Sequence, residues 1–210
     1  MKRSIILTLA VSLFASPALG HTDLIKGHSK DSGQQVTFRT ERVAGNVHVL
    51  FGSGGNIGLS VGSDGILMID TQFANIAERV KAEMAKLGSD KPRFIFNTHW
   101  HGDHTGGNEI FGRDSMIIAH ENVRKRMEET VMFRGQARTP SPKIALPMFV
   151  YGAGLSVYFN GERINALHMP KGHTDGDTIL FFTTSNVVHL GDDFFVGRFP
   201  FVDLESGGSV

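Results

Sequence analysis

The sequence contains no cysteine. This absence excludes disulfide bonds, thiolate metal ligands and cysteine nucleophiles together. Net charge is also absent, because 21 Lys and Arg residues balance 21 Asp and Glu residues. The densest basic group, Arg124-Lys125-Arg126, is followed by Glu128-Glu129 and is typical of a solvated helix face. We therefore expect no nucleic-acid partner.

Long apolar runs are missing beyond the N-terminus, so we expect no membrane span in the mature chain; a span takes about 20 apolar residues. Lys2-Arg3, the apolar run 5–15 and the small-x-small pattern Ala18-Leu19-Gly20 predict a signal peptide over residues 1–20. Cleavage there would leave a flexible lead-in over 21–34 and one domain over 35–210. We expect a periplasmic or secreted protein, and a lack of cysteine is compatible with a bacterial periplasm.

The stretch Thr98–His104, Thr-His-Trp-His-Gly-Asp-His, concentrates metal-ligand chemistry. Burying His99, His101, Asp103 and His104 together would be costly without a cation. A short apolar strand over 93–97 precedes them, so His99 and His101, two positions apart in extended chain, project to one side. Asp103 and His104 follow in a Gly-containing turn and can face a second metal.

Two later residues complete the candidate set. His173 lies in a turn-rich segment ahead of the apolar run 178–182, and Asp192 follows the buried strand 187–190 and Gly191. A carboxylate at the end of such a strand can bridge two cations. We expect the other histidines to be non-ligands: His21 and His28 in the lead-in, and His48, His120, His168 and His189 in strand-like runs.

The order HxHxDH, then Gly172-His173-Thr174, then Gly191-Asp192 resembles the metallo-β-lactamase superfamily of metal-dependent hydrolases, over residues 45–210. The resemblance implies an α/β fold, the αββα four-layer sandwich. It places Asp70 behind the metal ligands as a support. The implied ligands are His99, His101 and His173 for the first metal, Asp103 and His104 for the second, and Asp192 for both.

The resemblance is incomplete after Asp192. The family supplies a last histidine to the second metal from a later strand, whereas the last histidine here is His189. We therefore expect a C-terminally shortened member whose second half is incomplete. Such a chain should bind its second metal more weakly than its first, and should tend to self-associate.

The implied activity is hydrolysis of an ester, thioester, lactone or lactam-type bond in a small-molecule substrate, or of a phosphoester. A metal lowers the pKa of bound water to about 7, and Asp103, the expected catalytic residue, would orient the metal-bound hydroxide. Zinc is the expected metal, one or two ions per chain, although manganese or iron also accept these ligands. A bridging Asp192 favours the thioesterase, lactonase and phosphodiesterase branches. A β-lactamase proper and a truncated metal-binding non-enzyme remain the alternatives.

Several local patterns predict secondary structure around these motifs. Asn75 is expected to cap a helix whose apolar stripe includes Ile76, Val80 and Met84. Asn160-Gly161 predicts a hairpin turn. A further helix is expected to open at residues 105–108. Residues 132–147, with three prolines, are expected to form an irregular loop that either borders the substrate pocket or connects the two halves.

Overall fold

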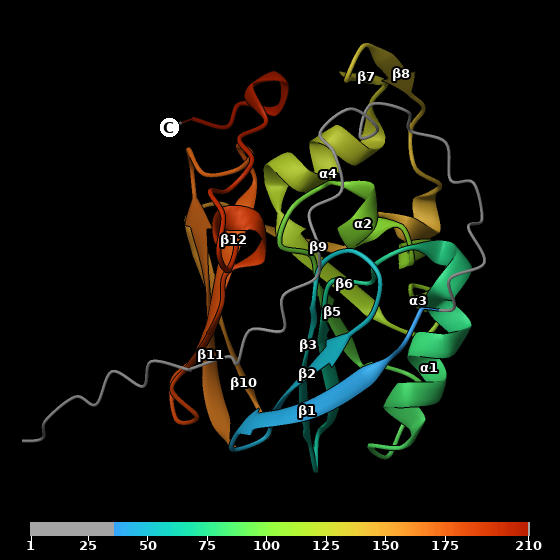
Figure 1. Ribbon diagram of the computed structural model, residues 1–210, viewed down its shortest axis with the longest axis vertical. Coiled ribbons are helices and arrows are strands. Elements are labelled where there is room, and N and C mark those ends of the chain that lie inside the picture. Colours follow the sequence, from blue (N-terminus) through green and yellow to red (C-terminus); the bar gives the residue numbers. More distant parts are fainter. Residues whose placement is uncertain (1–35, 210) are drawn as a thin grey trace, which may run out of the picture. The chain divides into compact units, whose positions relative to one another are not determined.

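The computed structural model describes residues 36–209 (Figure 1). The predicted signal peptide, the lead-in and the histidines at 21 and 28 lie outside the described residues. The strands are β1 Arg39–Ala44, β2 Val47–Phe51, β3 Ile57–Gly62, β4 Gly65–Ile69, β5 Phe94–Phe96, β6 Met116–His120, β7 Val131–Phe133, β8 Gln136–Arg138, β9 Phe149–Tyr151, β10 Gly154–Phe159, β11 Glu162–Met169, β12 Asp177–Phe182 and β13 Val187–His189.

A seven-stranded sheet in the order β1-β2-β3-β4-β5-β6-β9 carries the first half of the domain. Strands β1 to β4 pair antiparallel, and β4, β5, β6 and β9 pair parallel. Parallel strands direct their carboxyl ends to one edge of the sheet, where ligand sites of open α/β sheets form. This topology places Asp70, after β4, beside the histidine-rich loop that follows β5.

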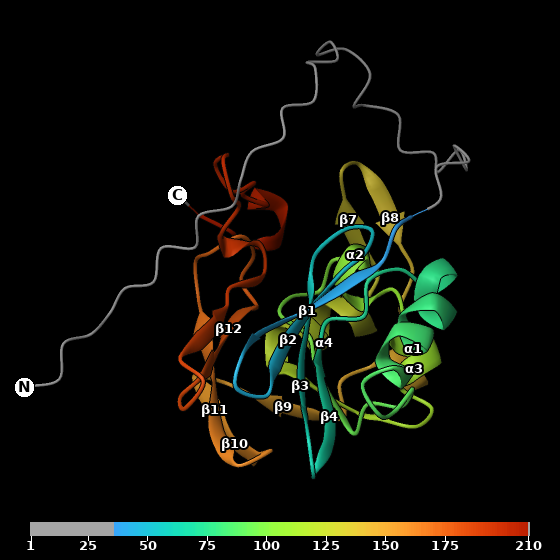
Figure 2. The same cartoon turned by 60° about the horizontal axis from the view of Figure 1, so that its bottom comes forward.

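The second sheet has the order β10-β11-β12-β13 and is antiparallel throughout. Its first hairpin turns at Asn160-Gly161, both with positive φ (51° and 79°), as that dipeptide predicts. A buried apolar cluster joins the two sheets: Phe96 and Ile118 come from the first, Leu180 and Phe182 from the second. Figure 2 shows the sheets facing each other.

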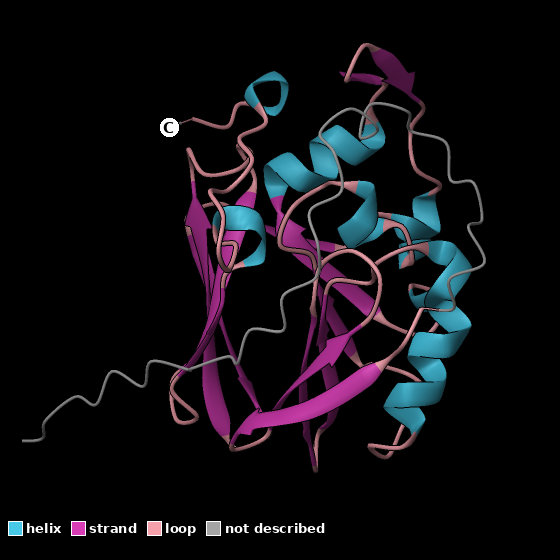
Figure 3. Cartoon of the chain, viewed as in Figure 1, coloured by secondary structure: helices cyan, strands magenta, loops and turns pink. Residues whose placement is uncertain are grey.

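The α-helices of the described residues lie on the other face of the seven-stranded sheet (Figure 3). They are α1 Ala77–Ala85, α2 Gly102–Thr105, α3 Asn108–Phe111 and α4 Glu121–Glu128. Val80 and Met84 of α1 pack against the sheet with Phe111. The predicted cap at Asn75 is wrong. Residues Ala74–Ile76 form a 3-10 turn, so Asn75 lies inside a turn and α1 starts after Ile76 without a side-chain cap.

The arrangement confirms the α/β class and supplies three layers: helices, seven-stranded sheet and four-stranded sheet. Within residues 36–209, no α-helix covers the outer face of the four-stranded sheet. Among the described residues, no helix combines the length and the apolar character that a membrane crossing needs.

Residues 132–147 differ from the expected irregular loop. Strands β7 and β8 form a small two-stranded sheet, and Arg134 and Gly135 turn between them with φ of 52° and 72°. A 3-10 turn, Lys143–Ala145, follows. Each strand is three residues long, too short for an alternating apolar pattern to appear in the sequence.

Candidate metal centre

The histidine-rich loop is fixed to β4 by Asp70. The Asp70 carboxylate accepts hydrogen bonds from the Thr98 backbone N–H and the Thr98 hydroxyl, both 2.8 Å, and from His104 Nδ1, also 2.8 Å. The expected support from Asp70 is therefore confirmed. Asp103 and His104, expected in a turn, lie in the single-turn helix α2, and the helix expected from residues 105–108 is the single turn α3.

Three imidazoles converge, two from this loop and one from residue 173. His99, His101 and His173 are all buried, and His101 Nδ1 lies 3.1 Å from His99 Nε2 and 2.9 Å from His173 Nε2. The three nitrogens form a group with the spacing of a metal site. The structure thus brings together the three histidines that the resemblance implies for the first metal.

Hydrogen bonds on the outer side of each ring assign its tautomer. His101 Nε2 donates to Asp203 Oδ2 at 2.8 Å, and His173 Nδ1 donates to the Phe201 carbonyl at 2.6 Å. The Thr98 hydroxyl already donates to Asp70, so it accepts from His99 Nδ1 at 3.1 Å. Each ring then turns a bare lone pair toward the other two. Three converging lone pairs repel one another unless a cation lies between them, so these residues fit a metal ion.

Burial keeps His99 and His101 neutral. It lowers the pKa of His99 well below its usual value, with neighbouring histidines adding to the effect. It also lowers the pKa of His101 to about 4, although the hydrogen bond to Asp203 acts in the opposite direction. Neutral imidazole is the form that binds a metal, so protons compete weakly for these two nitrogens.

A second group shares His99 and adds His104 and Asp192. His104 Nε2 is buried and has no hydrogen-bond partner; it lies 3.2 Å from Asp192 Oδ1 and 3.6 Å from Asp103 Oδ2, without hydrogen-bond geometry. Asp192 Oδ2 lies 3.8 Å from His173 Nε2. The two oxygens of Asp192 therefore face the two groups, one each. A buried nitrogen that has no hydrogen-bond partner and faces two carboxylates also fits a site for a cation.

Charge differs between the two groups. Burial opposes protonation of His104, but the carboxylates of Asp70 and Asp192 outweigh it and hold the His104 pKa well above its usual value. Burial likewise acts to raise the pKa of Asp192, yet its contact with His104 lowers it below the usual value. His99 and His101 are thus neutral, whereas His104 and Asp192 form an ionic pair.

The segment 201–208 supports the first group, and the sequence argument missed it. The Asp203 carboxylate accepts a hydrogen bond from His101, and the Phe201 carbonyl accepts one from His173. Trp100 Nε1 donates to Ser206 Oγ at 3.1 Å. The one local signal is that Asp203 caps the 3-10 turn Leu204–Ser206, and this signal says nothing about a histidine 102 positions earlier.

The other described histidines belong to neither group. His48 and His189 contact the carbonyls of Asn46 and Asn56. His120 and His168 stack on each other, although the sequence suggested no partner for either.

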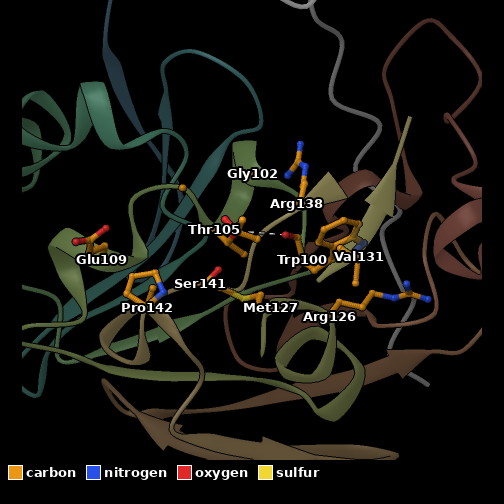
Figure 4. A pocket seen from close by; sticks show the side chains of 13 residues that line it. Trp100, Gly102, Thr105, Glu109, Arg126, Met127, Val131, Arg138, Ser141 and Pro142 are labelled. Atoms are coloured by element: carbon orange, nitrogen blue, oxygen red, sulfur yellow. Dashed lines mark hydrogen bonds between the residues drawn. The ribbon is translucent and has the colours of Figure 1, made fainter. Parts of the chain in front are cut away.

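A cavity of about 330 Å³ opens over the candidate centre. Its lining residues are Phe73, His101, Gly102, Asp103, Phe133, Arg134, Arg138, His173, Asp192 and Phe201. A second hollow, of about 200 Å³, lies between the loop and α4 and shares Gly102 and Arg138 with the first (Figure 4). Of the two interpretations of residues 132–147, the geometry supports a segment that borders the pocket.

Comparison with known proteins agrees with this geometry. Residues 50–209 match the family model of the metallo-beta-lactamase superfamily. The chain belongs to the metallo-beta-lactamase superfamily. Two curated members of similar sequence are the hydroxyacylglutathione hydrolases of Synechococcus sp. strain JA-3-3Ab, 34% identical over 123 residues, and of Thermosynechococcus vestitus, 31% identical over 123 residues. These matches cover 58% and 57% of this chain, and 42% and 41% of the relatives.

Solved superfamily structures share the fold. The subclass B3 metallo-beta-lactamase BJP-1 of Bradyrhizobium japonicum superposes with a TM-score of 0.61 at 22% identity, covering 72% of this chain and 61% of that one. A beta-lactamase from Chitinophaga pinensis gives 0.63 at 23% identity, covering 76% and 62%. The chain thus spans about two-fifths of the curated relatives' length and about three-fifths of these structures.

Proposed function

We propose that this protein is a metal-dependent hydrolase of an ester-type bond, with a thioester as the first candidate substrate. The observation that carries the proposal is the position of Asp192, whose two oxygens face His104 and His173, one in each group. A carboxylate placed between two metal-binding groups resembles the pattern of the thioesterase branches of the superfamily. The curated relatives named above are hydroxyacylglutathione hydrolases.

Zinc is the proposed metal. His99, His101 and His173 would hold the first ion, and three protein ligands suffice for a catalytic zinc site. Asp103 and His104 would hold the second ion, with Asp192 between the two. A bound zinc supplies water activated at neutral pH and polarises a substrate carbonyl.

The side chains have separate tasks in this proposal. Asp103, with a side chain 38% exposed, reaches into the cavity and can orient the attacking water and hold its proton. Asp203, Thr98 and the Phe201 carbonyl keep the three rings in the tautomers described above.

Elemental analysis and hydrolysis together test the proposal. The purified chain should carry zinc and release glutathione from a hydroxyacyl-glutathione thioester, measured with a thiol reagent. Asp192→Ala should lower kcat/KM at least about a hundredfold, and the exposed Asp90→Ala should match the parent. A β-lactam should be a poorer substrate. A metal-free chain, or one that hydrolyses only the β-lactam, would contradict the proposal.

The two ions should differ in affinity. The first group presents three lone pairs already aligned, whereas the second shares His99 with the first group, and its Asp192 faces both groups. We expect about one tightly held zinc per chain and a second that a weak chelator removes. Two zinc ions of equal affinity in a chelator titration would contradict this expectation.

Export through the segment 1–20 is also proposed, on the sequence pattern alone. Amino-terminal sequencing of the protein from a periplasmic fraction should begin at His21. An intact Met1 in the mature protein would contradict export by cleavage.

A further inference from the structure

Two arginines of the β7–β8 hairpin border the cavity over the candidate centre. The guanidinium carbon of Arg138 lies 4.5 Å from the ring centroid of Phe133 and 5.5 Å from that of Trp100. The guanidinium carbon of Arg134 lies 5.1 Å from Phe133 and 5.2 Å from Phe201. The aromatic rings thus hold two cations at the cavity wall.

Arg138 also lies against the metal loop itself. A Cβ placed on Gly102 would lie 3.3 Å from Arg138 Nη1. Gly102 separates His101 from Asp103 in the chain, so the guanidinium lies beside the ligand-bearing backbone. Gly102 and Arg138 line both hollows, which meet there.

Neither guanidinium has an acidic partner. Within the described part of the chain, no carboxylate lies within ion-pair distance of either guanidinium group, although Glu205 Oε2 accepts from the Arg134 backbone N–H at 2.8 Å. Neighbouring Arg126, by contrast, pairs with Asp175 at 2.7 Å. Arg138 is exposed, yet the surrounding protein desolvates its guanidinium group enough to lower its pKa. The negative charges of Asp103 and Asp203 act in the opposite direction. Planar guanidinium groups bind carboxylates through paired hydrogen bonds.

We propose that Arg138, assisted by Arg134, binds a carboxylate group of the substrate and makes the enzyme prefer anionic substrates over neutral ones. Phe133 and Phe201 would contact the apolar part next to that carboxylate. This proposal rests on the proposed hydrolase function and deepens it. If the arginines had a purely structural role, replacing them would lower kcat/KM equally for all substrates.

The test uses two esters with one leaving group. The zinc-loaded chain is assayed with 4-nitrophenyl butyrate, which is neutral, and with the mono-4-nitrophenyl ester of glutaric acid, which carries a carboxylate. Arg138→Gln should lower kcat/KM for the glutarate ester about tenfold or more, the loss expected for one hydrogen bond to a charged group. Its effect on the butyrate ester should stay below about twofold. Arg134→Gln should act in the same direction and more weakly.

Two controls separate charge recognition from folding. Arg113→Gln removes an exposed arginine outside both hollows and should leave the ratio of the two kcat/KM values unchanged. Added salt should lower this ratio in the parent and have little effect in Arg138→Gln, because salt screens exposed charges. Equal losses for both esters in Arg138→Gln, or an unchanged ratio, would overturn the proposal and leave the hydrolase function standing.

A binding measurement decides the case in which the chain hydrolyses neither ester. Hippurate, an aromatic carboxylate, and its neutral amide are titrated into the chain by calorimetry. The parent should bind hippurate at least about tenfold more tightly than the amide, and Arg138→Gln should remove most of this difference. Equal affinities in the parent would reject the carboxylate site, whereas a preference for hippurate without hydrolysis would reject only the proposed function.

Discussion

The imidazole rings of His120 and His168 stack with their centroids 3.6 Å apart and their planes within 14°. His120 ends β6 in one sheet, and His168 lies in β11 of the other. His120 Nδ1 accepts from the Asn122 backbone N–H at 3.2 Å, and His168 Nε2 donates to the Asp175 carbonyl at 2.9 Å. The pair thus links the two sheets outside the candidate metal centre.

This stack predicts a pH-dependent stability. Burial is the main cause that lowers the pKa of His120, and the neighbouring His168 lowers it further. The negative charges of Glu121 and Asp175 act in the opposite direction. The folded state therefore binds fewer protons than the unfolded state below about pH 6.5, and the unfolding free energy should fall as the pH falls. His120→Gln should cost about 1 kcal/mol at pH 7.5.

The variant has no imidazole to protonate, so its deficit relative to the parent should shrink toward pH 5. Urea unfolding of both proteins from pH 5 to 7.5 measures this difference. His48→Gln, on β2, is the control. A deficit that does not change with pH would contradict the role given to His120.

Single histidine replacements should divide into two classes. His99→Ala, His101→Ala and His173→Ala each remove one of three aligned nitrogens and should abolish tight zinc binding. His120→Ala, His168→Ala and His189→Ala should keep the parent zinc content, because these rings belong to neither group. Elemental analysis after dialysis measures the difference. If any member of the second class lost zinc as fully as His173→Ala, the ligand assignment would be wrong.

Asp203→Asn should weaken the first zinc by about ten- to a hundredfold. The Asp203 carboxylate accepts from His101 Nε2 at 2.8 Å and so keeps Nδ1 free for a metal. An amide nitrogen in its place can donate to Nε2, which moves the ring proton to Nδ1. Competition with a chromophoric chelator gives the affinity. Glu205→Gln, an exposed change nearby, should leave it unaltered, and an unaltered affinity in Asp203→Asn would exclude this support role.

Three glycines near the loop should differ in their tolerance of alanine. A Cβ on Gly106 would overlap the Gly102 carbonyl oxygen, and one on Gly107 would lie 2.6 Å from the Thr71 carbonyl oxygen. Both changes should lower the unfolding free energy by about 1–3 kcal/mol. A Cβ on Gly102 would meet only the end of the Arg138 side chain, 3.3 Å away, and no backbone atom, so Gly102→Ala should be tolerated. Urea unfolding measures the three variants, and a loss in Gly102→Ala as large as in Gly106→Ala would contradict this reading.

The sequence by itself determined the ligand-bearing motif and much of the framework. His99, His101, Asp103 and His104 are neighbours in the chain, so their proximity needed no knowledge of the fold. The Asn160-Gly161 turn was equally local, because its two residues readily adopt positive φ. The apolar stripe of α1 was visible because periodicity in the sequence follows the helix repeat.

Only the tertiary structure decided what surrounds these motifs. Asp203 reaches His101 across 102 residues, and His168 reaches His120 because two sheets pack face to face. The β7–β8 hairpin, with Arg134 and Arg138, left no pattern in strands three residues long. Local sequence reports backbone preference and periodicity, whereas hydrogen bonds, ring tautomers and the charge of a cavity depend on which distant segments the packing of the core brings together.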